Sequence, residues 1–328
     1  MSIEDISVTI VCLTYNHEKY IRQCLEGFIL QKTNFNFEVI VHDDASTDKT
    51  ASIIKEYENK YPDIIKGIYQ TENKYSKRID IFKPFILPIT RGKYMALCEG
   101  DDYWISNYKL QRQYDALKNN ENCHLAVCKV MGVNEEGHSN GNFFPNKERK
   151  TGIIKNIDFL WLISDAYSFQ TSSYFFETNH FYDYQLNMLK FMTEAPVGDV
   201  GILLYFSSIG DVYYINETMS CYRQGAINSW SEKFNKMQLD QKVTVYNKMI
   251  NVISKYDDFT QRRFHDICKY KIHNYEYKIL LLTRNYKQLK ENKYKQFWIK
   301  LSWKQRFFYH IMSFFPLKIQ KIVNRIID

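Results

Sequence analysis

The chain has 328 residues, of which 45% are hydrophobic and 25% are charged, fractions that are ordinary for a folded globular protein. This length suffices for a buried core and more than one packed unit, and the composition excludes a wholly disordered chain. The net charge is +7, but eleven Lys or Arg residues against two acids give residues 284–328 a local net charge of +9. The preceding residues therefore carry about −2, so the positive charge belongs to the C-terminal region.

Cysteine usage and hydropathy indicate the compartment. Seven cysteines are scattered along the chain with no pair at CxxC spacing. Reduced thiols in the cytoplasm explain this distribution better than a disulfide framework or a zinc site. The segment before the first apolar run is short and acidic, unlike a signal peptide, and no window of about 18 apolar residues could span a membrane. We expect a cytoplasmic protein.

The first 130 residues alternate short, β-rich apolar runs with stretches of helical pattern. Strands spaced by helices of this length predict βαβ crossovers and a mainly parallel sheet. The expected strands are 7–13, 37–42, 64–69 and 94–98. The expected helices are 18–30, 48–60 and 108–118.

Residues 131–228 have a less regular pattern. It predicts loops, a helix near 158–163, an apolar helix near 200–208 and short strands after that helix. From residue 230 onward the pattern is helical and polar.

Two adjacent acids, Asp43 and Asp44, end the second expected strand, and Ser46 and Thr47 open the next helix. We expect Ser46 or Thr47 to cap that helix whatever the function. A cap does not explain two acids at the tip of a buried strand, where desolvation is costly unless something pairs with them. The N–H groups of a nucleotide base would pair with them, and ligands on parallel sheets gather at the carboxyl ends of strands.

A second acidic cluster follows the apolar strand 94–98 and contains Glu99, Asp101 and Asp102. Three carboxylates within four residues concentrate negative potential, which a hard divalent cation such as Mn²⁺ or Mg²⁺ relieves. An acidic turn that caps the next helix is the alternative interpretation. Tyr103 and Trp104 in the same turn favour a site, because aromatic residues are poor choices for a solvated turn.

Three segments, in order, resemble the nucleotide-binding half of family 2 glycosyltransferases with the GT-A fold, especially the bacterial surface-polysaccharide branch. They are TIVCLTYNHEKYIRQCLEGFILQ, EVIVHDDASTDKT and RGKYMALCEGDDYWISNYKLQRQ. The resemblance covers residues 6–120 and extends more loosely to about residue 230. It implies an α/β GT-A domain over 1–230, with a mixed, mainly parallel sheet flanked by helices, and a helical basic extension over 231–328. Within that domain, 1–130 would bind the nucleotide and 131–230 the acceptor.

The resemblance also implies roles for the nucleotide-binding residues. Tyr15 would stack on or line the uracil of a UDP-linked donor, and Thr14 and Asn16 would shape the same pocket. Asp44 would hydrogen-bond the uracil N–H edge. UDP is favoured over GDP or dTDP only because members of this family commonly use UDP-linked donors.

Glu99 and Asp101 stand at the two acidic positions of the family's DxD motif. The resemblance implies that Asp101 ligates the Mn²⁺ or Mg²⁺ that bridges the diphosphate. Glu99, which replaces the usual first Asp, would lie near the ribose or a metal-bound water. Asp102 would support the metal site without ligating the metal itself.

The acceptor hydroxyl must lose its proton as it attacks the anomeric carbon, and a positioned carboxylate can accept that proton. Asp199, before the apolar helix 200–208, matches the general base of the family, and Glu194 is the second candidate. Asp199 as a simple helix cap is the alternative. Single displacement by this base implies an inverting enzyme.

Arg223, in the segment SCYRQGAINSW, resembles the arginine that meets the pyrophosphate in the family. Relatives often carry a histidine shortly after it, whereas Gln224, Gly225 and Ala226 follow here. An ordinary surface or salt-bridge role is the alternative for Arg223.

The basic C-terminal region repeats Trp303, Phe307, Ile311 and Phe314 at helical spacing, with basic residues around them. Residues 296–327 therefore predict an interfacial helix pair on an anionic membrane, beside a lipid-linked acceptor. A helix packed on the catalytic domain or on a dimer partner is the alternative. Nucleic acid is not an expected partner, because no recognition fold accompanies the charge.

Together these features predict an inverting glycosyltransferase at the inner face of the plasma membrane, which transfers a sugar from a UDP-sugar to a surface-polysaccharide or lipid-linked acceptor. A sugar nucleotidyltransferase is one alternative, but its Gly-rich phosphate loop has no counterpart in LTYNHEKY. A non-catalytic sugar-binding protein is the other, and it leaves Asp44, Asp101 and Asp199 unexplained. His17, His42, His124 and His138 show no metal-ligand spacing and are interpreted as structural.

Overall fold

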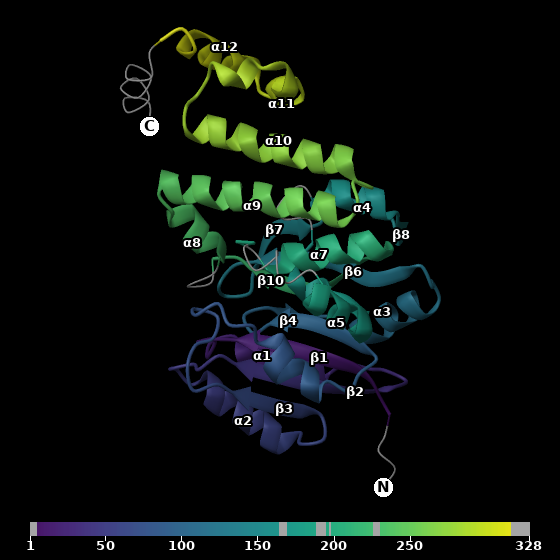
Figure 1. Cartoon of the computed structure of the whole chain (residues 1–328). Helices are drawn as coiled ribbons and strands as arrows, with labels where there is room; N and C mark the ends of the chain where they lie inside the picture. Colours follow the sequence, from purple (N-terminus) through teal and green to yellow (C-terminus); the bar gives the residue numbers. More distant parts are fainter. Residues whose placement is uncertain (1–4, 164–168, 188–194, 197, 226–229, 316–328) are drawn as a thin grey trace. The chain divides into compact units, whose positions relative to one another are not determined.

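The computed structural model describes residues 5–163, 169–187, 195–196, 198–225 and 230–315 (Figure 1). The chain divides into two compact units. The first comprises Met1–Lys190 with Asp199–Glu232, and the second comprises Phe191–Gly198 with Lys233–Asp328.

Within the described residues of the first unit, ten strands form one mixed sheet in the order β3-β2-β1-β4-β9-β6-β10-β5, with β7 beside β6 and β8 beside β10. The first five strands are β1 (Ile6–Thr14), β2 (Asn36–Asp43), β3 (Ile65–Tyr69), β4 (Tyr94–Glu99) and β5 (Tyr103–Trp104). The others are β6 (Cys123–Val133), β7 (Ser139–Phe144), β8 (Gly152–Ile154), β9 (Phe175–Glu177) and β10 (Asp211–Arg223).

Strand direction determines which residues share an edge of this sheet. Strands β3, β2, β1 and β4 are mutually parallel, and β6 is parallel to β10. Strand β9 is antiparallel to both β4 and β6, so β4, β6 and β10 all run in the same direction. The carboxyl ends of β1, β2, β4, β6 and β10 therefore lie along one edge, and their amino ends lie along the other.

Along the chain, most helices of the first unit come between two strands. They are α1 (Ile21–Ile29), α2 (Thr50–Lys60), α3 (Lys109–Lys118), α4 (Asn156–Leu162), α5 (Thr178–Asn187) and α7 (Gly198–Ile209), with short turns η1 (Phe82–Ile86), η2 (Leu87–Ile89) and η3 (Thr171–Ser173). Helix α1 buries Ile21, Cys24, Leu25 and Phe28, the spacing of a single apolar face. That face packs into a core with β1, β2 and β4, and α2 and α3 contribute to the same core.

The mixed, mainly parallel α/β fold is confirmed, and each element expected in the first 130 residues begins and ends within three residues of its prediction. Strands β6, β7, β8 and β9 were not predicted individually. The expected short strands after the helix 200–208 are one long strand, β10, which stays continuous through register shifts against β6.

The expected cap of α2 by Ser46 or Thr47 is wrong. The helix begins at Thr50 after Lys49, and Asp48 Oδ1, not Ser46 or Thr47, accepts from the Thr50 N–H at 2.9 Å. The Ser46 hydroxyl instead donates to Asp43 Oδ1 at 2.5 Å and accepts from the Asn16 N–H at 2.8 Å. Ser46 thus joins two loops rather than ending a helix.

The second unit is helical. Its elements are α9 (Leu239–Phe259), α10 (His265–Leu282), η4 (Gln288–Lys290), η5 (Asn292–Tyr294), α11 (Lys295–Trp298) and α12 (Trp303–Met312), and α8 (Trp230–Lys236) leads into them from the first unit. Helices α9 and α10 lie side by side, as Figure 1 shows. A small core of Tyr277, Tyr286, Leu289, Tyr294, Phe297 and Met312 joins α10 to the segments that follow it. Among the described helices, none combines the length and the apolar character needed to cross a membrane.

Candidate active site

The carboxyl ends of β1, β2 and β4 bring most of the predicted site residues together. Thr14 pairs with Asp43, and Leu13 pairs with Glu99, in adjacent parallel strands. The loop after each strand is held against the next, because the Gly100 N–H donates to the Leu13 carbonyl at 2.8 Å and the Asp44 N–H donates to the Thr14 carbonyl at 3.0 Å.

Asn16 fixes the first of these loops. Its backbone has a φ of 56°, a left-handed conformation that asparagine tolerates better than most residues. Its side-chain Oδ1 accepts from the Thr47 N–H at 2.8 Å, so Asn16 and Ser46 join the first two loops from both sides. The neighbouring Tyr15 is 39% exposed, which leaves its ring available to a ligand.

Asp44 is buried, and its carboxylate orders a third loop. Oδ1 accepts from the Lys74 N–H at 2.8 Å, and Oδ2 accepts from the Tyr75 N–H at 2.9 Å. Each carboxylate oxygen can accept a second hydrogen bond, so this arrangement fixes Asp44 and still leaves it able to bind a base edge.

Three buried polar atoms without a hydrogen-bond partner gather where the loops after β1 and β4 meet. They belong to Thr14 (Oγ1), His17 (Nδ1) and Asp101 (Oδ1). Gly100 permits this close approach, because a Cβ at that position would lie 2.7 Å from Thr14 Oγ1 and 3.0 Å from His17 Nδ1. Buried polar atoms are nearly always paired in folded proteins, so a group of unpaired atoms indicates a ligand site.

Asp199 adds a further carboxylate from the first turn of α7. Its Oδ1 is buried without a partner, and burial raises the pKa of Asp199 to about 6. Desolvation, followed by the charges of Asp101 and Asp199, raises the pKa of Glu99 to about 8. Three acids from two distant segments therefore interact electrostatically at one site.

Asp101 offers a ligand atom to a divalent metal ion. Its Oδ1 has no protein partner, and carboxylate oxygens are the ligands that Mg²⁺ and Mn²⁺ prefer. Among the described residues, Glu99, Asp101 and Asp199 do not bring three ligand atoms within 4.8 Å of one another, so a metal here would need further ligands from the substrate. Burial is the largest cause of the raised pKa of Glu99, and repulsion by Asp101 and Asp199 adds to it; a bound cation would remove that repulsion.

Arg223 reaches the same edge from the end of β10, but its guanidinium group is buried against protein. It lies between the rings of Tyr20 and Tyr103, with its Cζ 4.6 Å and 5.4 Å from the two ring centroids. Its four hydrogen bonds are to the carbonyls of Asp101 at 2.9 Å, Asn134 at 3.2 Å and Glu135 at 2.5 Å, and to Gln23 Oε1 at 3.0 Å.

The backbone N–H of Arg223 also donates to Asp102 Oδ1 at 2.9 Å. Burial, together with Asp101 and Glu99, raises the pKa of Asp102 well above its usual value. Arg223 and Asp102 thus hold the turn that carries Asp101. This geometry favours a positioning role for Arg223 over direct contact with a phosphate.

Two further residues line the site without having been singled out as site residues from the sequence. His17 Nε2 lies 4.0 Å from Asp101 Oδ2. Burial and then the charges of Asp199 and Glu99 raise the pKa of Tyr174. A tyrosine in a loop or short strand carries no sequence signal for such a place. Glu194, the second candidate for the base, lies outside the described residues.

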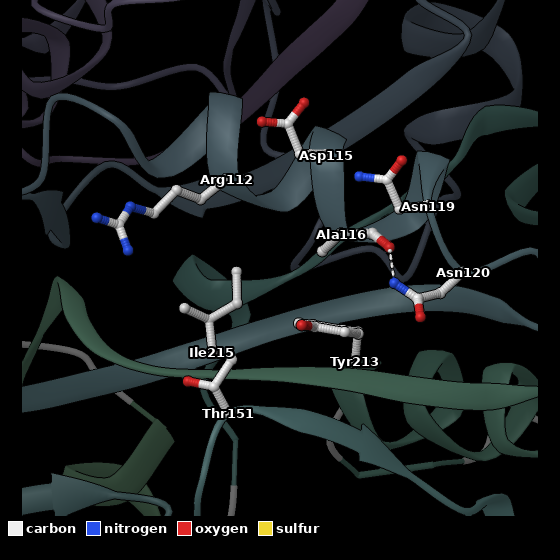
Figure 2. A pocket seen from close by; sticks show the side chains of 8 residues that line it. All are labelled: Arg112, Asp115, Ala116, Asn119, Asn120, Thr151, Tyr213 and Ile215. Atoms are coloured by element: carbon white, nitrogen blue, oxygen red, sulfur yellow. Dashed lines mark hydrogen bonds between the residues drawn. The ribbon is translucent and has the colours of Figure 1, made fainter.

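A separate cavity of about 310 Å³ opens between α3, β10 and the residue before β8 (Figure 2). It is lined by Arg112, Asp115, Ala116, Asn119, Asn120, Thr151, Tyr213 and Ile215. None of the carboxylates described above borders it, so we assign it no part in the site.

Comparison with known proteins identifies the family. Residues 9–169 match the model of glycosyl transferase family 2. An uncharacterized protein of Mycobacterium tuberculosis is 33% identical over 234 residues, which cover 69% of this chain and 61% of that protein. The dTDP-rhamnosyl transferase RfbG of Shigella flexneri is 33% identical over 39% of this chain and 43% of its own length.

Solved structures support the fold. The crystal structure of S. aureus TarS in complex with UDP-GlcNAc has a TM-score of 0.61 at 15% identity, and the match covers 92% of this chain and 78% of that one. The confirmed fold is therefore the GT-A type that the motifs implied, with helices following the sheet domain. Residues 9–169 of the chain thus belong to the family 2 glycosyltransferases. The chain spans about three fifths of the length of the curated mycobacterial proteins that it matches.

Proposed function

We propose that this chain is an inverting glycosyltransferase of surface-polysaccharide synthesis. It moves one sugar from a UDP-sugar to an acceptor hydroxyl, with Asp199 as the general base and with Mn²⁺ or Mg²⁺ held by Asp101. The names of its relatives support this class, since they include a poly(ribitol-phosphate) β-glucosyltransferase of Bacillus spizizenii, 31% identical over 40% of this chain. The TarS complex with UDP-GlcNAc supports a UDP-linked donor.

One observation carries the proposal: Glu99, Asp101 and Asp199 interact at one edge of the sheet, and Asp101 and Asp199 each keep a buried carboxylate oxygen without a partner. Two acids within one turn could be a solvated acidic loop. A third acid from a helix about a hundred residues later, desolvated beside the first two, requires a positively charged or hydrogen-bonding ligand.

The nucleotide would occupy the loops after β1 and β2. Asp44 accepts the N–H of the uracil, the exposed ring of Tyr15 stacks on the base, and Thr14 and Asn16 shape the pocket wall. A metal ion on Asp101 would supply positive charge to the departing diphosphate.

Asp199 would accept the proton of the acceptor hydroxyl. A pKa of about 6 leaves this carboxylate mostly ionised at neutral pH and a stronger base than an ordinary aspartate. Attack from one face while the diphosphate leaves from the other inverts the anomeric carbon. Residues 131–230 would provide the acceptor half of the domain, and 231–328 a separate helical extension.

Calorimetric titration of UDP with and without Mn²⁺ tests the nucleotide and metal sites together. We expect UDP to bind more tightly with Mn²⁺, and Asp101→Ala to remove that metal dependence. Asp115→Ala, an exposed acid on α3, is the matched control. If neither UDP, GDP nor dTDP binds under either condition, the proposal is wrong, and a sugar-binding protein without this chemistry becomes the better interpretation.

The surface of α12 supports a second part of the proposal, attachment to an anionic membrane through residues 296–327. One side of this helix packs Phe308, Tyr309 and Met312 into the core of the second unit. The other side exposes Trp303 (69% exposed), Phe307 (61%) and Ile311 (40%), and Phe314 (74%), in the turn after the helix, extends this row of large apolar side chains.

Charge complementarity favours a membrane as the partner of this row. Lys300 and Lys304 are exposed beside it, in a region whose net charge is +9. Each basic residue near an anionic leaflet contributes about 1 kcal/mol. The enzyme would then lie where a lipid-linked acceptor is found.

Vesicle co-sedimentation tests the attachment. We expect binding to vesicles that contain anionic phosphatidylglycerol, weaker binding to neutral phosphatidylcholine, and loss of binding in the double variant Trp303→Asp, Phe307→Asp. Leu239→Asp, which alters an exposed leucine on α9, should bind normally. If the parent does not bind anionic vesicles, and is a dimer whereas the double variant is a monomer, the row instead contacts a second copy of the chain.

A further inference from the structure

A second group of metal-ligating side chains lies at the opposite edge of the sheet. It consists of His124 in β6, Glu177 at the end of β9 and His180 in the first turn of α5. One ligand atom from each residue lies within 4.8 Å of the other two. Among the described residues, this is the only group of three His, Cys, Asp or Glu side chains with that spacing.

Strand direction separates this group from the carboxylates. Glu177 pairs with Tyr94, the first residue of β4, whereas Glu99 is the last residue of the same strand. The full length of β4 therefore lies between the two places. A six-residue strand is about 17–20 Å long, too far for one ion to serve both.

A β-bulge directs His124 into this group. Cys123 pairs with Asp211 of β10 and Leu125 pairs with Val212, so His124 is the extra residue between them. A bulge reorients a side chain and interrupts the regular hydrogen bonding between the two strands. On the other side of β6, Leu125 pairs with Phe176, and the same antiparallel register places His124 beside Glu177.

Gly210 makes room for the imidazole of His124. A Cβ on Gly210 would lie 2.7 Å from His124 Cδ2 and 2.6 Å from the carbonyl oxygen of Asn122. The ring is therefore enclosed by backbone on the side of β10. On its other side the ring of His180 lies 4.3 Å away between centroids.

The hydrogen bonding of His124 resembles that of a metal ligand more than that of a side chain in a protein hydrogen-bond network. His124 Nδ1 is buried and has no hydrogen-bond partner. Two imidazoles and a carboxylate are a ligand set that zinc accepts, with a fourth position left for water or another group.

We propose that His124, Glu177 and His180 form a second metal site that binds Zn²⁺ or a similar borderline divalent cation. The ligands of a tetrahedral zinc ion are about 3.4 Å apart, so small side-chain rotations close the present spacing. The ion would join β6, β9 and α5 at the edge of the sheet remote from the proposed chemistry. Its role would be structural, and the expected effect of binding is on stability rather than on turnover.

Under this proposal His124 is a metal ligand, whereas the sequence, which shows no metal-ligand spacing, predicts a structural role for it. Glu177 and His180 are three residues apart in sequence, but His124 lies more than fifty residues earlier and gives no spacing signal. The sheet alone brings them together.

Zinc titration of the full chain tests the proposal, in an Asp101→Ala background that removes the proposed ligand of the other site. We expect one Zn²⁺ per chain by calorimetry, tetrahedral absorption bands when Co²⁺ replaces it, and a rise in melting temperature with either metal. His124→Ala and His180→Ala should weaken Zn²⁺ binding at least about tenfold and abolish the rise in melting temperature. His138→Ala, which changes an exposed histidine elsewhere, should behave like its parent.

Circular dichroism and melting in EDTA establish that each variant is folded before metal is added. Glu177→Gln keeps the shape of the side chain and removes its charge, so it replaces any histidine variant that fails to fold. Zinc binding that survives in both His180→Ala and Glu177→Gln, or no zinc binding by the parent, would overturn the proposal. Because the Asp101 variant is the parent, these outcomes do not depend on whether the chain transfers sugar.

Discussion

The two edges of the central sheet differ in the atoms they offer to a ligand. At the carboxyl edge the oxygens of Glu99, Asp101 and Asp199 interact, and burial, followed by the charges of Asp101 and Asp199, raises the pKa of Glu99 to about 8. At the amino edge two imidazoles and one carboxylate meet. Hard cations prefer the first set and borderline cations accept the second. The same strands can therefore hold two sites that metal type and mutation should separate.

The largest expected effect comes from Asp199→Asn at the carboxyl edge. Loss of a positioned general base typically costs about 10²–10⁴ in rate, so we expect kcat to fall by that factor with any UDP-sugar the enzyme accepts. UDP affinity should change little, because Asp199 faces the acceptor in the proposed mechanism. Initial rates of transfer measure the first quantity, and calorimetry measures the second.

Asp158→Asn, at an exposed acid in α4, is the control for Asp199→Asn. Zinc affinity should be the same in both variants, since neither touches the amino edge. A rate for Asp199→Asn within about threefold of the parent would contradict the base assignment, because a general base contributes far more than that. It would leave Glu194 as the candidate.

Arg223→Ala should produce the next largest effect, and on stability. The substitution leaves the carbonyls of Asp101 and Glu135 without a buried donor and removes the side chain between Tyr20 and Tyr103. We expect the free energy of unfolding to fall by about 3 kcal/mol in urea titrations. Arg112→Ala, which breaks an exposed ion pair with Glu217, should cost less than about 1 kcal/mol.

The same pair of variants tests the role expected for Arg223 from the family resemblance. A phosphate-contacting arginine would show normal stability and weakened UDP binding. A positioning arginine should lose stability first, and Arg223→Lys should not restore it, because lysine cannot reproduce the planar set of hydrogen bonds.

The pH dependence of the rate gives a smaller effect at the same edge. Burial raises the pKa of Asp199 to about 6, so the base is protonated and inactive below that pH. We expect kcat/KM to be level near neutral pH and to fall about tenfold per unit as the pH drops below 6. The residual rate of Asp199→Asn should lack this acid limb. A limb that persists in the variant would belong to another group.

The sequence predicted which residues meet at the carboxyl edge far better than which residues meet at the amino edge, and the reason is physical. Asp44, Glu99 and Asp101 each follow a continuous apolar run, and parallel strands place such positions at one edge without further information. The amino edge depends on the pairing of β9 between β4 and β6 and on a bulge at His124, which are long-range features. No local pattern specifies either of them.

Arg223 shows the same limit within a predicted motif. Its position at the end of a strand and its place at the carboxyl edge follow from the sequence. Its hydrogen bonds do not, because they join it to a loop and to helix α1, 88 and 200 residues away along the chain. The motif therefore predicted proximity to the site and not the atom that the guanidinium contacts.

Two glycines give the smallest and most discriminating test of the difference between the edges. Gly100→Ala would place a Cβ 2.7 Å from Thr14 Oγ1 at the carboxyl edge, and Gly210→Ala would place one 2.7 Å from His124 Cδ2 at the amino edge. Overpacking of this kind costs about 1–2 kcal/mol, so both variants should fold. Gly100→Ala should weaken Mn²⁺-dependent UDP binding about tenfold and leave zinc binding unchanged. Gly210→Ala should have the opposite pattern, and if both variants weaken both ligands alike, the two edges do not bind independently.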